Sequence, residues 1–254
     1  MSLEDNHPAV VTIAGLDPSG CAGLAADIKT FEALGVAGRA VASAITVQSE
    51  TKLLETVWLG SELILKQLKV LLEESDIKYF KIGVIESLPV LRKILSLIRA
   101  YDGNAFILWD PIVSSSSGYK FHENLPDRTE LVSILKQISL ITPNIPEAEW
   151  LFGQGYTNGD LFEFSNSAAI ILKGGHQTGS CAIDRLYADG ELSEFSGERL
   201  NILKRGTGCV YSAALLAYLA HGLTLKQAIG KAKEYINKYL VSSSSLRGYH
   251  TMVA

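Results

Sequence analysis

The chain has 254 residues, 47% of them hydrophobic, which suits one large α/β domain with a sizeable buried core. Its formal net charge of −4 argues against broad nucleic-acid binding, and no apolar run is long enough to span a membrane. The three cysteines are odd in number and far apart, so they indicate neither a disulfide framework nor a zinc site. Together with a polar N-terminus that is unlike a signal peptide, these features predict a cytoplasmic protein.

In the first part of the chain, short apolar runs alternate with amphipathic segments, which is the spacing of βαβ units. The expected strands cover residues 9–15, 41–47, 79–85, 106–110 and 139–141. The expected helices cover residues 23–34, 61–74, 89–101 and 126–137. This alternation predicts a parallel sheet with helices on both faces, in one domain over residues 1–254.

The second part of the chain adds antiparallel signals. After a short helix, residues 169–172 form another buried strand. Two further strand-like runs then flank Asp189-Gly190, a strong hairpin signal, so antiparallel strands are expected late in the sheet. Two helices finish the chain, the last beginning at a capping box that starts at Thr224. The serine run at residues 242–245 predicts a mobile tail.

The sharpest chemical signal is the segment Arg205-Gly-Thr-Gly-Cys209, which an apolar helix follows at once. Glycines let a backbone turn tightly, and a helix start presents free N–H groups and the positive end of its dipole. The segment is therefore a candidate anion site, and Cys209 sits where the dipole should lower a thiol pKa. On this motif alone, a glycine-rich turn with a buried structural cysteine is an equally weighted alternative.

Four other polar or glycine-rich segments follow expected strands or open helices. They are the loop from Gly15 to Gly23, Asp110, the segment from Thr142 to Glu147, and the segment from Lys173 to His176. Asn144 and Glu147 carry oxygens suited to Mg²⁺, and Lys173 can reach a phosphate. The ordinary alternatives are a plain turn, helix capping and a solvated lysine. Because the carboxyl ends of parallel strands meet at one edge, all five segments predict one crevice suited to phosphoryl transfer.

These segments also carry a family resemblance. The motifs are Thr12-Ile-Ala-Gly15, Asp17-Pro-Ser-Gly20, Ala26-Asp-Ile-Lys-Thr30, Thr142-Pro-Asn144 with Pro146-Glu147, Lys173-Gly-Gly-His176 and Gly206-Thr-Gly-Cys209. As an ordered set they resemble the hydroxymethylpyrimidine/phosphomethylpyrimidine kinases of the ribokinase-like superfamily, over nearly the whole chain. The resemblance implies a ribokinase-like three-layer α/β/α sandwich with a mostly parallel sheet, commonly in a homodimer. It also implies ATP- and Mg²⁺-dependent phosphorylation of the pyrimidine precursor of thiamine, of its monophosphate, or of both.

The resemblance further implies a role for each candidate residue. The implied catalytic residues are Cys209, at the position of the superfamily's base, and the anion-hole residues Gly206, Thr207 and Gly208. The implied substrate-binding residues are Gln48, Asp27 and Gly15. The implied ATP ligands are Lys173, Gly174 and Asn144, and the implied Mg²⁺ ligands are Glu147 and Asp110. An amide such as that of Gln48 both donates and accepts, which suits an aminopyrimidine edge.

Several positions depart from the family pattern. Cys21, Ala25 and Arg205 stand where the family usually has Gly, Gln and His, and residues 154–168 look too short for the helix that normally occurs there. A pyridoxal kinase of vitamin B6 salvage is the alternative enzyme, since it shares the fold and phosphorylates a hydroxymethyl group on a flat heterocycle. The usual pyridoxal kinases carry Asp at the Cys209 position, which favours the pyrimidine enzyme. A non-catalytic ligand-sensing domain is a further alternative, against which the intact anion hole argues.

Overall fold

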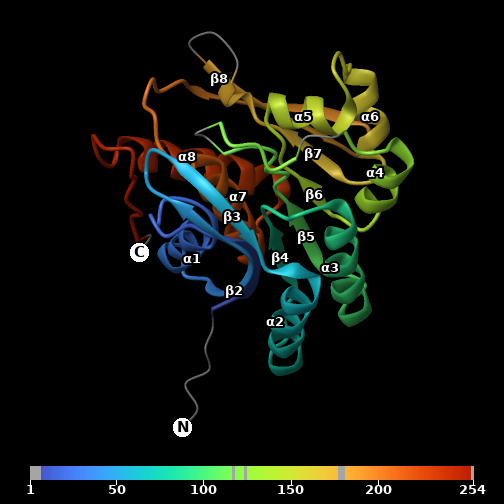
Figure 1. Ribbon diagram of the computed structural model, residues 1–254. Coiled ribbons are helices and arrows are strands. Elements are labelled where there is room, and N and C mark those ends of the chain that lie inside the picture. The colour runs from blue at the N-terminus through green and yellow to red at the C-terminus, as the bar shows by residue number, and fades with distance from the viewer. Residues whose placement is uncertain (1–6, 116–117, 123–124, 177–180, 253–254) are drawn as a thin grey trace.

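The structure is a computed structural model that describes residues 7–115, 118–122, 125–176 and 181–252. One nine-stranded sheet runs through it, in the order β3-β2-β1-β4-β5-β6-β7-β8-β9 (Figure 1). The strands are β1 (Ala9–Leu16), β2 (Ala37–Gln48), β3 (Leu53–Trp58), β4 (Tyr79–Ile82), β5 (Phe106–Trp109), β6 (Leu140–Ile141), β7 (Ala169–Leu172), β8 (Cys181–Ala188) and β9 (Glu191–Glu198). The six central strands, β2-β1-β4-β5-β6-β7 in sheet order, are parallel to one another. The strand β3 at one edge and β8 and β9 at the other pair antiparallel. The predicted mostly parallel sheet is confirmed.

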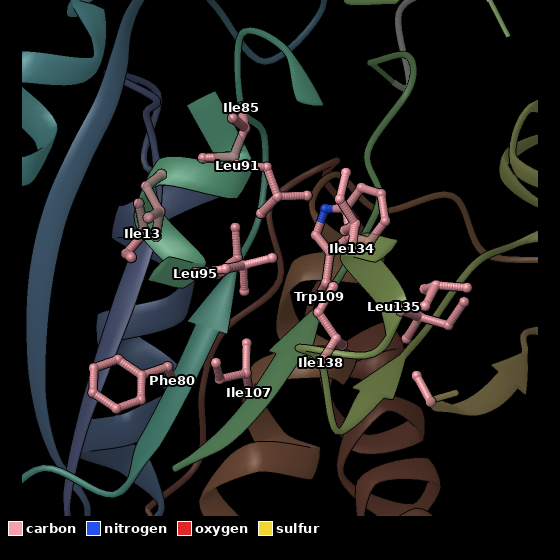
Figure 2. Close-up of a cluster of buried hydrophobic side chains, with 14 of the residues drawn as sticks. Ile13, Phe80, Ile85, Leu91, Leu95, Ile107, Trp109, Ile134, Leu135 and Ile138 are labelled. Carbon is pink, nitrogen blue, oxygen red and sulfur yellow. The ribbon is translucent and has the colours of Figure 1, made fainter. Parts of the chain in front are cut away.

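Helices cover both faces of this sheet. They are α1 (Gly23–Ala33), α2 (Gly60–Glu74), α3 (Leu88–Tyr101), α4 (Arg128–Leu135), α5 (Ile145–Phe152), α6 (Asn158–Ser165), α7 (Thr207–Ala220) and α8 (Leu225–Val241). One apolar cluster joins α1, α7 and α8 to the sheet, and a second joins α2 to α6 to its other face. In the second cluster, Leu91 and Leu95 of α3 lie over Phe80 and Ile107 of the sheet (Figure 2). In the part of the chain that the structure describes, no helix combines the length and apolarity of a membrane span.

The strand β3 and the helix α6 differ from the sequence prediction. The edge strand β3 has no counterpart in it, because its residues alternate irregularly between half-buried and exposed, with Leu54 and Val57 on the outside. The expectation that residues 154–168 are too short for a helix is wrong. The helix α6 forms there with a capping box between Thr157 and Asp160. The predicted hairpin is confirmed, since its two turn residues have φ values of 53° and 74°.

The end of the chain returns to the body of the protein. The buried Lys204 ammonium donates to the carbonyl oxygens of Ser243, at 2.6 Å, and of Ser245. The Leu246 carbonyl accepts from the Arg205 amide at 2.9 Å. Residues 243, 245 and 246, in and beside the run predicted to be a mobile tail, are therefore hydrogen-bonded to the segment just before α7.

Candidate active site

The helix α7 begins at a tight turn. Its N-cap Gly206 has a φ of 69°, in the left-handed region that glycine adopts without strain. The Cys21 carbonyl oxygen lies so close that a Cβ added to Gly206 would overlap it. Glycine is thus required for the backbone angle and for contact with the loop after β1. The first N–H groups of α7, beginning with Thr207 and Gly208, have no acceptor within the helix, which suits them to an anion.

Cys209 lies in the first turn of α7, and its side chain is buried. Burial raises the pKa of the thiol to about 11, although the Lys81 charge and a hydrogen bond from the Gly23 amide act to lower it. The prediction of a lowered pKa is therefore wrong for the ligand-free protein. Removal from water outweighs the helix start, and the neutral thiol is the resting form near neutral pH.

Asp110 follows β5 and is the centre of a buried polar cluster. Its Oδ1 accepts from Lys173 Nζ at 2.8 Å and from Thr142 Oγ1 at 3.0 Å, and its Oδ2 accepts from Ser212 Oγ at 3.0 Å. Burial alone would raise the pKa of Asp110, but Lys173 and Lys81 outweigh it and hold the pKa below its usual value. The carboxylate is therefore ionised and fixes the position of Lys173.

Lys173 follows β7 and lies between two carboxylates. Its Nζ is 2.8 Å from Asp110 Oδ1 and 3.6 Å from Glu147 Oε2. Burial would lower the pKa of Lys173, but the two carboxylates outweigh it and raise the pKa. Burial raises the pKa of Glu147 to about 7, because Lys173 offsets only part of the effect. The lysine stays charged, while Glu147 titrates near neutral pH when no ligand is bound.

The glycine turn and this polar cluster meet at Gly208. A Cβ added to Gly208 would lie 3.6 Å from Lys173 Nζ and 4.0 Å from Asp110 Oδ2. Lys173 also pairs with Asn144 in an isolated parallel bridge, which places the start of α5 beside the end of β7. Segments more than 90 residues apart in the chain thus form one site at the carboxyl edge of the sheet.

The predicted ATP ligands Asn144 and Gly174 already have structural partners. Asn144 caps α5. Its side-chain Oδ1 accepts from the Glu147 backbone amide at 2.9 Å, and the Asn144 backbone amide donates to Glu147 Oε2 at 2.7 Å. The Gly174 amide donates to Asp184 Oδ1 at 2.9 Å. For Asn144 the helix-capping alternative is confirmed, and the ATP contacts of both residues stay predictions.

The loop between β1 and α1 is organised by Asp17. Its carboxylate accepts from the amides of Ser19, at 2.7 Å, and of Ala22, at 2.9 Å. The Gly15 carbonyl packs against Gly23, whose amide donates to the Cys209 sulfur. Gly23 therefore links Gly15 to the Cys209 thiol, in the region where the sequence predicts the substrate pocket.

Gln48 is the half-buried last residue of β2. Near it, Thr46 Oγ1 donates to the Leu16 carbonyl at 3.0 Å. This bond holds the end of β2 beside the end of β1, so Gln48 lies at the same edge of the sheet as Gly15. Recognition of a pyrimidine by Gln48 stays a prediction.

Asp27 lies in the interior. Both of its oxygens accept from Lys81 Nζ at 2.8 Å, and Oδ2 also accepts from Thr12 Oγ1 at 2.6 Å. Neither Asp27 nor Lys81 has any exposed surface. The carboxylate is thus committed to an internal ion pair, and direct contact with a substrate stays a prediction that this placement does not favour.

Magnesium fits this site as a partner of phosphates. Among the described residues, no three His, Cys, Asp or Glu side chains gather as a metal site would require. Asp110 and Glu147 nevertheless present two carboxylates to one cation, the Lys173 ammonium. Proteins commonly bind Mg²⁺ through one or two carboxylates together with substrate phosphates. The residues present therefore suit an ion that arrives with ATP.

Three buried polar residues without a role in the sequence prediction complete the site: Asp17, Lys81 and Ser212. Two of them carry a recognisable signal. Lys81 is a lysine inside an apolar strand, and Ser212 is a polar residue in an otherwise apolar helix. Buried polar groups need partners, so such positions point to internal networks, here around Asp27 and Asp110.

Comparison with known proteins identifies the family of this chain. A family model described as phosphomethylpyrimidine kinase matches residues 17–254. The chain belongs to this family. The hydroxymethylpyrimidine/phosphomethylpyrimidine kinase of Aquifex aeolicus (strain VF5) is 35% identical in an alignment that covers 95% of this chain and 98% of that protein.

Solved structures show the same fold. The phosphomethylpyrimidine kinase from Clostridium difficile 630 is 30% identical with a TM-score of 0.74, covering 90% of this chain and 97% of the other. The pyridoxal kinase from Staphylococcus aureus, solved in complex with ADP, has a TM-score of 0.83 at 23% identity, covering 97% and 94%. The second likeness shows the fold alone, and together they confirm the ribokinase-like architecture.

Proposed function

We propose that this phosphomethylpyrimidine kinase family member transfers the γ-phosphoryl group of ATP to 4-amino-5-hydroxymethyl-2-methylpyrimidine, to its monophosphate, or to both. The observation that carries the proposal is the meeting of the glycine turn with Lys173 and Asp110 at Gly208. Phosphoryl transfer depends mainly on positioning and charge neutralisation, and the site supplies free amides, a fixed ammonium and two carboxylates.

In this mechanism the Gly206–Gly208 amides stabilise the charge that develops on the transferred group. Lys173, held by Asp110, neutralises phosphate charge. Asp110 and Glu147 would hold Mg²⁺, which supplies further neutralisation of the ATP phosphates when bound. The buried location keeps these interactions strong, because little water screens them.

Cys209 is the proposed catalytic base. Its raised pKa leaves only a small thiolate fraction near neutral pH. A loose transition state needs little activation of the acceptor before transfer, so a base of this kind is compatible with turnover. The acceptor hydroxymethyl oxygen would lie beside the Cys209 sulfur and give up its proton to the thiolate form.

The pyrimidine would bind between the loop after β1 and the end of β2, with Gln48 pairing to its aminopyrimidine edge. The homodimer implied by the family is supported by apolar side chains exposed on the neighbouring strands β2 and β3, namely Ile45, Val47, Leu54 and Val57. Sedimentation of the purified protein tests that assembly, and a monomer at all concentrations would reject it.

A coupled ADP-release assay with Mg-ATP tests the function. Hydroxymethylpyrimidine, its monophosphate and pyridoxal are offered in parallel. Turnover of a pyrimidine substrate is expected. Turnover of pyridoxal alone would assign the protein to vitamin B6 salvage, the alternative that the shared fold keeps open. If none of the three compounds leads to ADP release, ligand sensing without catalysis is favoured.

A further inference from the structure

The segment after α8 crosses beside the site. It is anchored on both sides of Arg247: Lys204 holds Ser243 and Ser245, and further on His250 Nδ1 lies 3.0 Å from the Tyr235 hydroxyl. Between these anchors Gly248 packs so closely on the Tyr239 ring that an added Cβ would overlap it. Figure 1 shows this red segment next to the blue loops at the ends of β1 and β2.

From this segment, the Arg247 guanidinium contacts two loops that leave the adjacent ends of β1 and β2. Its Nη2 donates to the Ser19 carbonyl at 2.9 Å and lies 2.9 Å from Glu50 Oε1, and its Nε donates to the same Glu50 oxygen at 3.2 Å. The Cys21 side chain is a further hydrogen-bonding partner of Arg247. One planar fork therefore spans the β1–α1 loop and the turn after β2.

Both loops belong to the proposed substrate pocket. The carbonyl of Cys21 packs on Gly206, the first residue of the anion turn. Glu50 lies two residues after Gln48, the proposed pyrimidine ligand. A change in the separation of these loops would therefore change the distance between the pyrimidine site and the point of phosphoryl transfer.

We propose that Arg247 is a positioning residue that sets the width of the acceptor pocket by clamping these two loops. The role rests on the proposed function, because the pocket is the one assigned there to the pyrimidine. It needs the fork of an arginine, since a lysine is a point charge and does not reproduce donors to both loops at once. Acceptor binding therefore depends on Arg247, whereas ATP, held near Lys173, does not.

The test compares Arg247→Ala, Arg247→Lys and Glu50→Gln with a variant of another surface ion pair. Arg92→Ala is the control, because Arg92 Nη2 and Glu130 Oε1 form a 3.0 Å pair between α3 and α4, away from the two loops. Both Arg247 variants are expected to raise the acceptor KM about tenfold and leave the Mg-ATP KM within about twofold. Glu50→Gln should show a smaller rise, and Arg92→Ala none.

Amide hydrogen exchange supplies a readout that needs no turnover. Exchange in residues 17–22 and 48–52 is expected to be faster in Arg247→Ala than in the wild type and unchanged in Arg92→Ala. An unchanged acceptor KM in Arg247→Ala, an equal rise in both KM values, or full rescue by Arg247→Lys would overturn the proposal. If the wild type phosphorylates no acceptor, the proposed function is rejected independently of Arg247. In that case, unchanged hydrogen exchange in these loops in Arg247→Ala would reject the role of Arg247.

Discussion

Cys209 is subject to two opposing influences. The start of α7 and the Lys81 charge favour a thiolate, while burial favours the thiol and raises the pKa to about 11. The same burial shields the thiol from water. The residue is therefore suited to act on a bound acceptor and poorly suited to react with solutes from solvent.

This balance gives a pH-dependent reactivity. With a pKa of about 11, only about one Cys209 in ten thousand is a thiolate at pH 7, and the fraction grows about tenfold for each pH unit up to the pKa. Alkylation of Cys209 by iodoacetamide in the ligand-free protein should be slow near neutral pH and accelerate at alkaline pH. Peptide mapping by mass spectrometry follows each cysteine, with the exposed Cys181 as the internal comparison. Rapid modification of Cys209 at pH 7 would contradict the raised pKa.

Replacement of Cys209 by serine tests its role in transfer. A hydroxyl ionises far less readily than a thiol, so kcat should fall by about a hundredfold or more, the usual contribution of a positioned base. Mg-ATP affinity, measured by calorimetry, should be nearly unchanged, because Lys173 and the anion turn remain. The control Cys181→Ser changes an exposed residue of β8 and should keep wild-type turnover. Near-wild-type kcat in Cys209→Ser would remove the thiol from the mechanism.

Gln48 offers a second test at the scale of one side chain. Gln48→Ala removes a donor and an acceptor from the proposed pyrimidine edge, so the acceptor KM should rise about tenfold or more. The Mg-ATP KM should stay close to the wild-type value, since the nucleotide is held across the site. Steady-state kinetics with each substrate varied in turn measures both. Equal increases would undo the assignment of Gln48.

At the scale of elements, the site depends on how α7 begins. Gly206→Ala places a methyl group in a left-handed conformation and against the Cys21 carbonyl. Gly222 also has a positive φ, of 85°, but nothing lies near its added Cβ, so Gly222→Ala is a matched control. The control should lose roughly 1–2 kcal/mol of unfolding free energy from the backbone angle. Gly206→Ala should lose more and be inactive, as measured by urea unfolding and ADP release. Equal stability losses with activity retained would show that the Cys21 contact is unimportant.

The elements that could be predicted from sequence are those with a strong internal pattern. Fully apolar runs such as Ala169–Leu172 can only be buried, and the carboxyl ends of parallel strands meet, so the strand-end segments converge as expected. The strand β3 could not be predicted, because an edge strand has weak alternation. The serine run at residues 242–245 could not be predicted either. Nothing in its sequence indicates that Lys204, about 40 residues earlier, donates to the carbonyls of Ser243 and Ser245.

The same limit applies to the site. Residue types and spacing predict which groups come together at one edge of the sheet, because glycine turns and strand ends place them there. They do not predict the pKa of Cys209 or the internal pairing of Asp27 with Lys81. Both depend on burial and on charges brought close by tertiary packing.

At the scale of the whole molecule, distant parts of the chain meet at one edge of the sheet to form the site. The loop at Asp17, the turn at Gly206 and the segment carrying Arg247 touch one another although more than 200 residues separate the first from the last. The helices on both faces fix this edge, so the pocket is assembled by the fold itself. We therefore expect the preference for one flat heterocycle over another to depend on the loops at this edge.

Acceptor choice distinguishes a pyrimidine kinase from a pyridoxal kinase of the same fold, and a competition assay measures it. Hydroxymethylpyrimidine and pyridoxal are mixed at equal concentration with limiting Mg-ATP, and the phosphorylated products are quantified by mass spectrometry. Phosphorylated pyrimidine should be the dominant product, and the ratio of products gives the ratio of kcat/KM values. Pyridoxal phosphate as the dominant product would contradict the assignment while leaving the fold and the phosphoryl-transfer site unchanged.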